Sequence, residues 1–179
     1  MNESLLDILR RGGNILYVRH GEATIGEDLP NLNFLYCCTQ RNLSEMGKRQ
    51  AICYGQKLRN SGIPVCYPIQ VSPYCRTIET AQLAFGYNGL QIDPFWYNIS
   101  RLNDHLSGTE QQRILDTLRS RLEIIPPRGC NQVIVDHNFP EGIGLGQITD
   151  MGTVVVKPGG QNNGYDILAN LSLMEMLNL

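Results

Sequence analysis

The chain has 179 residues and a formal net charge of −2. These values predict one globular domain over residues 1–179, long enough to bury a sizeable core, and they argue against disorder. Fifteen basic residues stand against seventeen acidic ones, so a broad surface for nucleic acid or anionic lipid is not expected. A few focused arginines can still bind a small anion.

The first fourteen residues are not typical of a secretory signal or of a membrane span. Glu3 and Asp7 interrupt the apolar residues, and the longest uncharged apolar run there is Leu5-Leu6. We therefore expect a cytoplasmic protein with no membrane partner. Export is the alternative, if a signal sequence is removed from a longer precursor. The sequence carries no indication of oligomeric state.

The first strong element is an apolar run rich in β-formers, Asn-Ile-Leu-Tyr-Val at residues 14–18. It predicts a buried strand that ends abruptly at Arg-His-Gly-Glu, residues 19–22. Residues 23–42, with a glycine, a proline and several asparagines, predict a loop. A loop this long in a compact domain is often functional.

A helix is predicted to start behind Ser44 as its N-cap and to stop before Gly62 and Pro64. Residues 69–71 predict a second short strand. A second helix should follow it at once.

Ser72 would cap this second helix and Pro73 would take its first position, since proline is favoured there. The helix is expected to run to Phe85 and to end at Gly86. Residues 90–108 are predicted to be irregular.

The remaining elements complete an alternation of strands and helices. Residues 111–122 predict a helix, 132–135 and 153–156 predict strands, and 165–171 predict a strand that pairs back as a hairpin. This order favours a three-layer α/β/α sandwich with a mainly parallel central sheet. Ligands bind such sheets beyond the carboxyl ends of the strands.

Four side chains suited to phosphate should meet at that edge. Arg19 and His20 follow the first strand, Arg76 lies in the first turn of the second helix, and His137 follows the strand 132–135. Arginine forks hold a phosphoryl group bidentately, and a neutral imidazole can attack phosphorus. A second histidine can donate to the charge that develops on the phosphoryl oxygens. This chemistry needs no metal or other cofactor, and we predict none.

The ordered motifs at residues 19–22, 43–47, 72–77 and 133–138 resemble the histidine phosphatase superfamily, which includes the phosphoglycerate mutases. The similarity extends from about residue 14 to about residue 158. It implies a phosphoglycerate mutase-like fold and a phosphohistidine intermediate. The compact chain is similar to the short phosphatases of this superfamily.

By this resemblance His20 is the catalytic nucleophile, and Arg19, Arg76 and His137 bind the phosphoryl group. His137 also acts in catalysis by stabilising the transferred group. Two threonines of the third motif region would pack the helix rather than bind ligand. They are Thr77 and Thr80.

The chain departs from the family at the acid that protonates the leaving group. Asn138 follows the second histidine where the acid phosphatases have aspartate. Residues 101–105 are similar to the mutase segment that carries the catalytic glutamate, so Asp104 is the first candidate for the catalytic acid. Asp136 and Glu141 are the other candidates.

The leading hypothesis is a phosphatase whose substrate is a phosphorylated small molecule or a phosphoprotein side chain. A phosphoglycerate mutase is a weaker alternative, because the chain is short and has no basic C-terminal tail. A phosphate-recognising module without catalysis is the third. The loop 23–42 and the segment 93–110, with Trp96 and Tyr97, are expected to line the substrate pocket. For the two aromatic residues a place in the core is an equal alternative.

The six cysteines form no Cys-x-x-Cys pair of a zinc or redox site. In a cytoplasmic protein we expect them to be reduced. One exception is open: if the loop 23–42 folds over the site, Cys37 or Cys38 could meet Cys75. Such a bridge would hold the loop over the phosphate pocket and would indicate an exported protein.

Overall fold

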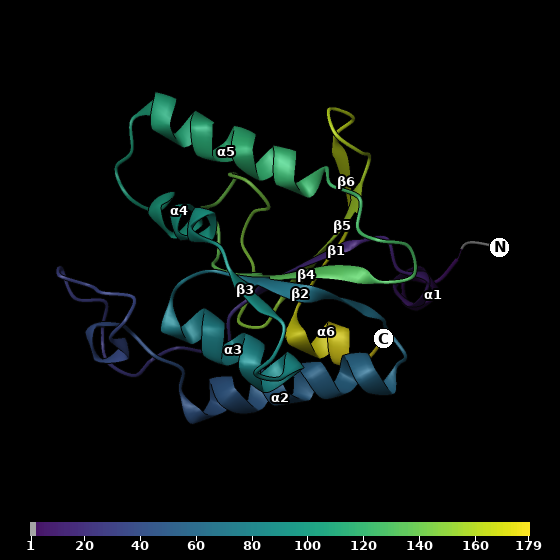
Figure 1. Ribbon diagram of the computed structural model, residues 1–179, viewed down its shortest axis with the longest axis horizontal. Helices are drawn as coiled ribbons and strands as arrows, with labels where there is room; N and C mark the ends of the chain where they lie inside the picture. Colours follow the sequence, from purple (N-terminus) through teal and green to yellow (C-terminus); the bar gives the residue numbers. More distant parts are fainter. Residues whose placement is uncertain (1–2) are drawn as a thin grey trace.

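A computed structural model describes residues 3–179 and contains one six-stranded sheet with helices on both faces (Figure 1). Its order is β3-β2-β4-β1-β5-β6. The strands are β1 (Ile15–Arg19), β2 (Val65–Val71), β3 (Leu90–Ile92), β4 (Asn131–Asp136), β5 (Thr153–Pro158) and β6 (Tyr165–Leu171). Strands β1 to β4 are parallel to one another, β5 is antiparallel to β1, and β6 is antiparallel to β5. The predicted sandwich with a mainly parallel sheet is confirmed.

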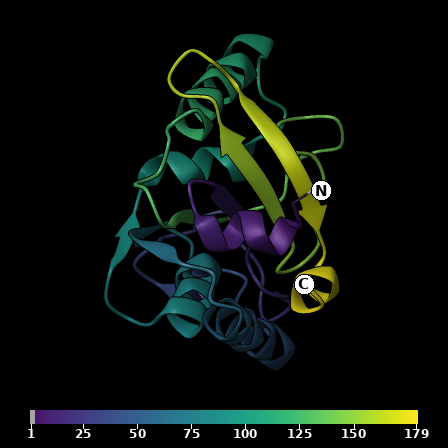
Figure 2. The ribbon, with the colours of Figure 1, turned by 90° about the vertical axis from the view of Figure 1, so that its right-hand side faces the viewer.

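The helices lie in two layers. They are α1 (Leu5–Arg11), α2 (Glu45–Asn60), α3 (Cys75–Phe85), α4 (Tyr97–Arg101), α5 (Gly108–Leu122) and α6 (Leu173–Leu177). Figure 1 shows α2, α3 and α6 on one face of the sheet and α4 and α5 on the other. In Figure 2 the β5–β6 hairpin extends toward α5, and at its tip the Asn162 amide donates to the carboxylate of Glu123 just after that helix.

Strand β1 is central to both layers of the core. Leu16 and Val18 point into the cluster on the α2 side, and Ile15 and Tyr17 point into the cluster on the α5 side. This alternation follows from the two-residue period of a strand. Because both faces are covered, β1 is uniformly apolar until Arg19, where it reaches the edge of the sheet.

Two local predictions were wrong. The N-cap of α3 is Tyr74 rather than Ser72, so Pro73 precedes the helix instead of opening it. Ser72 fails to cap because its hydroxyl lies 3.2 Å from Nε2 of His137. The stretch 90–108 is also not irregular throughout, since it contains β3, a 3₁₀ turn at Pro94–Trp96 and α4.

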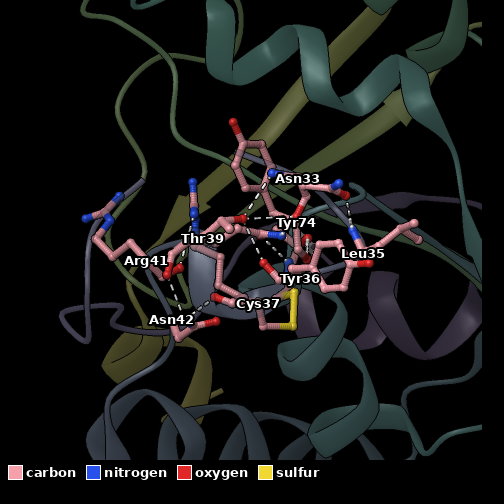
Figure 3. The surroundings of a disulfide bond; sticks show 12 residues. Asn33, Leu35, Tyr36, Cys37, Thr39, Arg41, Asn42 and Tyr74 are labelled. Carbon is pink, nitrogen blue, oxygen red and sulfur yellow. Dashed lines mark hydrogen bonds between the residues drawn. A yellow bond between two sulfur atoms is a disulfide. The ribbon is translucent and has the colours of Figure 1, made fainter. Parts of the chain in front are cut away.

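The expectation of reduced thiols was wrong for four of the six cysteines. Cys37, and not Cys38, is bonded to Cys75 (Figure 3), and a second disulfide joins Cys66 to Cys130. The two cysteines that remain free are exposed; they are Cys38 and Cys53. Neither bridge is visible as a local pattern, because the half-cystines are 38 and 64 residues apart.

The helices described over residues 3–179 include none that is both long enough and apolar enough to cross a membrane.

Candidate active site

Two glycines allow the loop after β1 to lie directly against the start of α2. A side chain on Gly21 would meet the Gly47 carbonyl oxygen at 2.6 Å, and one on Gly47 would meet the Glu22 carbonyl oxygen at 2.1 Å. Ser44, the confirmed N-cap of α2, also donates to the Glu22 carboxylate at 2.6 Å. The second motif, residues 43–47, therefore holds the Arg-His loop in place.

The predicted phosphate-binding side chains gather around one cavity of about 630 Å³ at the carboxyl edge of the parallel strands. Its lining includes Arg19, His20, Arg76, His137 and Asp104. The other two candidates for the leaving-group acid are not part of the lining. Asp136 is buried behind it, and Glu141 is on an exposed turn.

His20 is buried, and one of its ring nitrogens has a fixed role. Its Nδ1 lies 2.7 Å from the carbonyl oxygen of Gly21. A carbonyl can only accept, so the hydrogen is on Nδ1 and Nε2 carries a free electron pair. Burial and the nearby Arg76 guanidinium lower the pKa of His20 to about 3, which keeps the ring neutral at neutral pH. A neutral ring with a free Nε2 is able to act as a nucleophile.

This low pKa predicts a loss of stability in mild acid. Below pH about 6.5 His20 binds a proton in the unfolded chain but not in the folded protein. The free energy of unfolding therefore decreases as the pH falls. At about pH 4.5, two units lower, this amounts to about 3 kcal/mol at roughly 1.4 kcal/mol per unit. We expect His20→Gln to reduce the difference in unfolding free energy between about pH 7.5 and about pH 4.5 by that amount.

Urea unfolding at the two pH values measures this difference. The matched control is His105→Gln, which replaces an exposed histidine outside the cavity lining. An identical acid-induced loss in His20→Gln and the native protein would contradict the prediction.

The second histidine lies beside the first. The ring centroids of His20 and His137 are 5.3 Å apart, and the planes are inclined at 74°. Burial lowers the pKa of His137 well below its ordinary value, and the positive groups nearby lower it further. Both imidazoles are therefore neutral in the free protein. A bound anion would favour the protonated form of either ring.

Several contacts fix the position of Arg76 in the lining of the cavity. Its two terminal nitrogens donate to the two carboxylate oxygens of Asp28 at 2.9 and 3.1 Å, and its guanidinium lies 4.1 Å from the Tyr74 ring centroid. Its Nε–H is buried and has no partner within the described residues. The carboxylate thus fixes the guanidinium, and the Nε–H group of Arg76 remains without a partner.

Arg19 repeats this arrangement on β1. One terminal nitrogen donates to the Ile148 carbonyl oxygen at 2.8 Å, and the other forms an ion pair with an Asp150 carboxylate oxygen at 2.9 Å. Its Nε–H is likewise buried without a partner in the part of the chain described. Burial lowers the pKa of Arg19, Asp150 opposes this shift, and Arg41 and Arg76 lower the pKa further. The cavity therefore carries a concentrated positive potential that favours an anion.

The loop 23–42 contributes residues that the sequence did not single out. Asp28 and Arg41 both line the cavity. Figure 3 shows Arg41 among the residues that surround the bridge between Cys37 and Cys75, with its side chain directed away from the sulfur atoms. The Gln40 side chain accepts from the Cys75 amide at 2.9 Å. The disulfide ties this loop to the start of α3, beside Arg76. The only local signal for these residues was the length of the loop.

One wall of the cavity is aromatic. Phe34, Tyr74 and Tyr97 line it, and Phe34 lies edge-on to both tyrosines with centroid distances of 5.1 and 5.3 Å. The prediction that Tyr97 lines the pocket is confirmed. For Trp96 the core alternative holds, because this side chain is buried in the core against Tyr17.

Among residues 3–179 no group of three or more histidine, cysteine, aspartate or glutamate side chains is arranged to hold a metal ion.

The fold is that of the phosphoglycerate mutase-like histidine phosphatases. Phosphoserine phosphatase from Entamoeba histolytica, in complex with 3-phosphoglyceric acid, superposes with a TM-score of 0.56 at 16% identity, over 91% of this chain and 98% of that one. Alpha-ribazole phosphatase from Shigella flexneri gives 0.56 at 14% identity, over 89% and 96%. The protein histidine phosphatase SixA, complexed with tungstate, gives 0.53 at 12%, over 90% and 97%.

The sequence agrees with this fold. Residues 15–96 match the family model of the histidine phosphatase superfamily (branch 1), which confirms the resemblance drawn from the motifs. This stretch includes Arg19, His20 and Arg76, and it ends before the segment that carries His137. A search of curated proteins finds no match to the chain.

Proposed function

We propose that the protein is a histidine phosphatase that hydrolyses a phosphomonoester or a phosphorylated protein side chain. The observation that carries this proposal is the pairing of a nucleophile with vacant donors. His20 presents a free electron pair on Nε2, and the same cavity is lined by Arg19 and Arg76, whose Nε–H groups have no partner among the described residues. Buried N–H groups without a partner are costly, and a bound phosphoryl group would satisfy both.

The proposed reaction has two steps. Nε2 of His20 attacks phosphorus, the bond from phosphorus to the leaving oxygen breaks, and that oxygen takes a proton from a catalytic acid. Water then attacks the phosphohistidine, releasing inorganic phosphate and neutral His20. Arg19, Arg76 and His137 would hold the transferred group and stabilise the charge on its oxygens.

A single set of assays tests the proposal. Hydrolysis of p-nitrophenyl phosphate and phosphoglycerate mutase activity are measured for the native protein and for His20→Ala. Hydrolysis that depends on His20, without mutase activity, is the expected result. Mutase activity would favour the phosphoryl-transfer alternative, and phosphate binding without turnover would favour a recognition module.

Asp104 remains the first candidate for the leaving-group acid, because it is the one of the three candidates that lines the cavity. We expect Asp104→Asn to slow an alkyl phosphate by about 10²-fold or more and p-nitrophenyl phosphate only slightly, since p-nitrophenol departs without protonation. Steady-state rates on both substrates measure this. Asp116→Asn, at an exposed position of α5, is the control. An equal slowing of both substrates would show that Asp104 is not the acid that protonates the leaving group.

The two disulfides favour the exported alternative over the cytoplasmic one, because such bonds persist in oxidising compartments.

We expect unreduced protein in denaturant to show two free thiols, from Cys38 and Cys53, and reduced protein to show six. Loss of the bridge that holds the loop, in Cys37→Ser, should cost about 3–4 kcal/mol of unfolding free energy by the chain-entropy model. Cys38→Ser is the matched control. Six free thiols without reductant would contradict the bridges.

A further inference from the structure

The least explained group near the cavity is the carboxyl of Asp136, the last residue of β4. It is fully buried, and its Oδ1 has no hydrogen-bond partner among the described residues. That oxygen lies 3.7 Å from Nε2 of His137. The other oxygen, Oδ2, lies 3.0 Å from the hydroxyl of Tyr17. The carboxyl therefore stands between the core of the sheet and a histidine of the proposed phosphate site.

The hydrogens around Tyr17 can be counted. Its hydroxyl owns one hydrogen, yet it lies within hydrogen-bonding distance of two oxygens, Oδ2 of Asp136 and the carbonyl oxygen of His137 at 2.9 Å. If the carboxyl is ionised, one of these two short contacts contains no hydrogen. A proton on Oδ2 completes the set: Asp136 donates to Tyr17, and Tyr17 donates to the carbonyl. The geometry therefore favours a neutral carboxyl in the free protein.

The surroundings agree with this count. Burial raises the pKa of Asp136 well above its ordinary value, although Tyr17, the Ser72 hydroxyl and the Arg76 guanidinium act in the opposite direction. Burial and its neighbours, His20 and the arginines of the cavity, lower the pKa of His137. A buried acid that keeps its proton thus lies beside a buried base that lacks one.

An arriving phosphoryl dianion reverses the balance, because two negative charges beside His137 stabilise the protonated imidazole. We propose that Asp136 stores a proton in the free protein and transfers it to His137 when a phosphoryl dianion binds. The proposal rests on the phosphate site proposed above. Asp136 acts through His137 and is a positioning residue.

The transfer is balanced within the protein. The carboxyl group turns about its Cβ–Cγ bond so that its protonated oxygen faces Nε2 of His137, and the Ser72 hydroxyl, 3.2 Å from Nε2, turns away from that nitrogen. The O–H bond of Asp136 breaks, the Nε2–H bond of His137 forms, and the gap between the carboxylate and Nε2 closes as a carboxylate–imidazolium pair. The Tyr17 hydroxyl turns from the carbonyl of His137 to the new carboxylate. The dianion then faces a cation, and no proton is taken from solvent.

Infrared difference spectroscopy with inorganic phosphate tests this directly. The free native protein should show the C=O band of a buried neutral carboxyl, and phosphate should abolish it. Asp136→Asn should lack the band in both states. Asp116→Asn, the exposed control on α5, should behave as the native protein. Tyr17→Phe removes the donor that stabilises the carboxylate, so its band should persist after phosphate is added.

Calorimetry in two buffers of different ionisation enthalpy completes the test. The native protein should bind phosphate with no net proton uptake, whereas Asp136→Asn should bind it at least about tenfold more weakly or take up about one proton from the buffer. Phosphate binding without loss of the carboxyl band in the native protein would overturn the proton store and leave the phosphatase proposal intact. Failure of the native protein to bind phosphate would overturn the phosphate site itself.

Discussion

His20→Ala is expected to abolish hydrolysis of p-nitrophenyl phosphate, lowering kcat by at least about 10⁴-fold. The reason is geometric as well as chemical. The Gly21 carbonyl holds the His20 hydrogen on Nδ1 and leaves Nε2 free to attack, whereas Nε2 of His137 is engaged with the hydroxyl of Ser72. The neighbouring histidine is therefore poorly placed to replace the lost nucleophile.

Two measurements make this result specific. Rapid acid-quench with labelled substrate should trap label on the native protein in an acid-labile, alkali-stable form, and none on His20→Ala. Circular dichroism should show that the variant is folded, because His20 lies beyond the end of β1 and outside the two apolar clusters. His105→Ala, an exposed histidine outside the cavity lining, is the control and should retain full activity. Retained turnover in His20→Ala would refute the proposed nucleophile.

Arg76→Lys should lower kcat/KM by about 10²–10³-fold although the charge is conserved. Arg76 is only 3% exposed, and its guanidinium donates to both carboxylate oxygens of Asp28 as well as to the Arg41 carbonyl oxygen at 3.2 Å. A lysine ammonium cannot hold this fork and also direct a donor to a phosphoryl group. It would pair with Asp28 alone and withdraw from the ligand.

Steady-state kinetics on p-nitrophenyl phosphate and phosphate inhibition constants measure the effect, which should appear in both. The control is Arg113→Lys on the exposed face of α5. Equal rates for lysine and arginine at position 76 would show that this residue does not contact phosphate.

The parts of the fold that depend on local signals could be predicted from the sequence. Ser44 caps α2 through its own hydroxyl, Gly86 ends α3, and the apolar run before Arg19, rich in β-formers, is a strand covered on both faces. The convergence of His20 and His137 followed from the rule that parallel strands share a carboxyl edge.

Three of the errors have a common cause, which is competition from distant residues. Serine is favoured at N-caps, but the hydroxyl of Ser72 lies against His137, 65 residues away. Asp28 was overlooked because its partner is 48 residues further along the chain. The pairing of cysteines depends in the same way on where a loop lies, which no local pattern records.

The central position of β1 also determines when the active site can form. Its two neighbours in the sheet are β4 and β5, so Ile15 pairs with Gln132 on one side and with Val156 on the other. Pairings this distant in sequence slow folding, because a long loop must close before the contact is gained. During synthesis the strand that carries Arg19 and His20 therefore stays unpaired until β4 and β5, in the last third of the chain, have been synthesised. A fragment limited to residues 15–96 would contain the family signature but neither of the strands that position it.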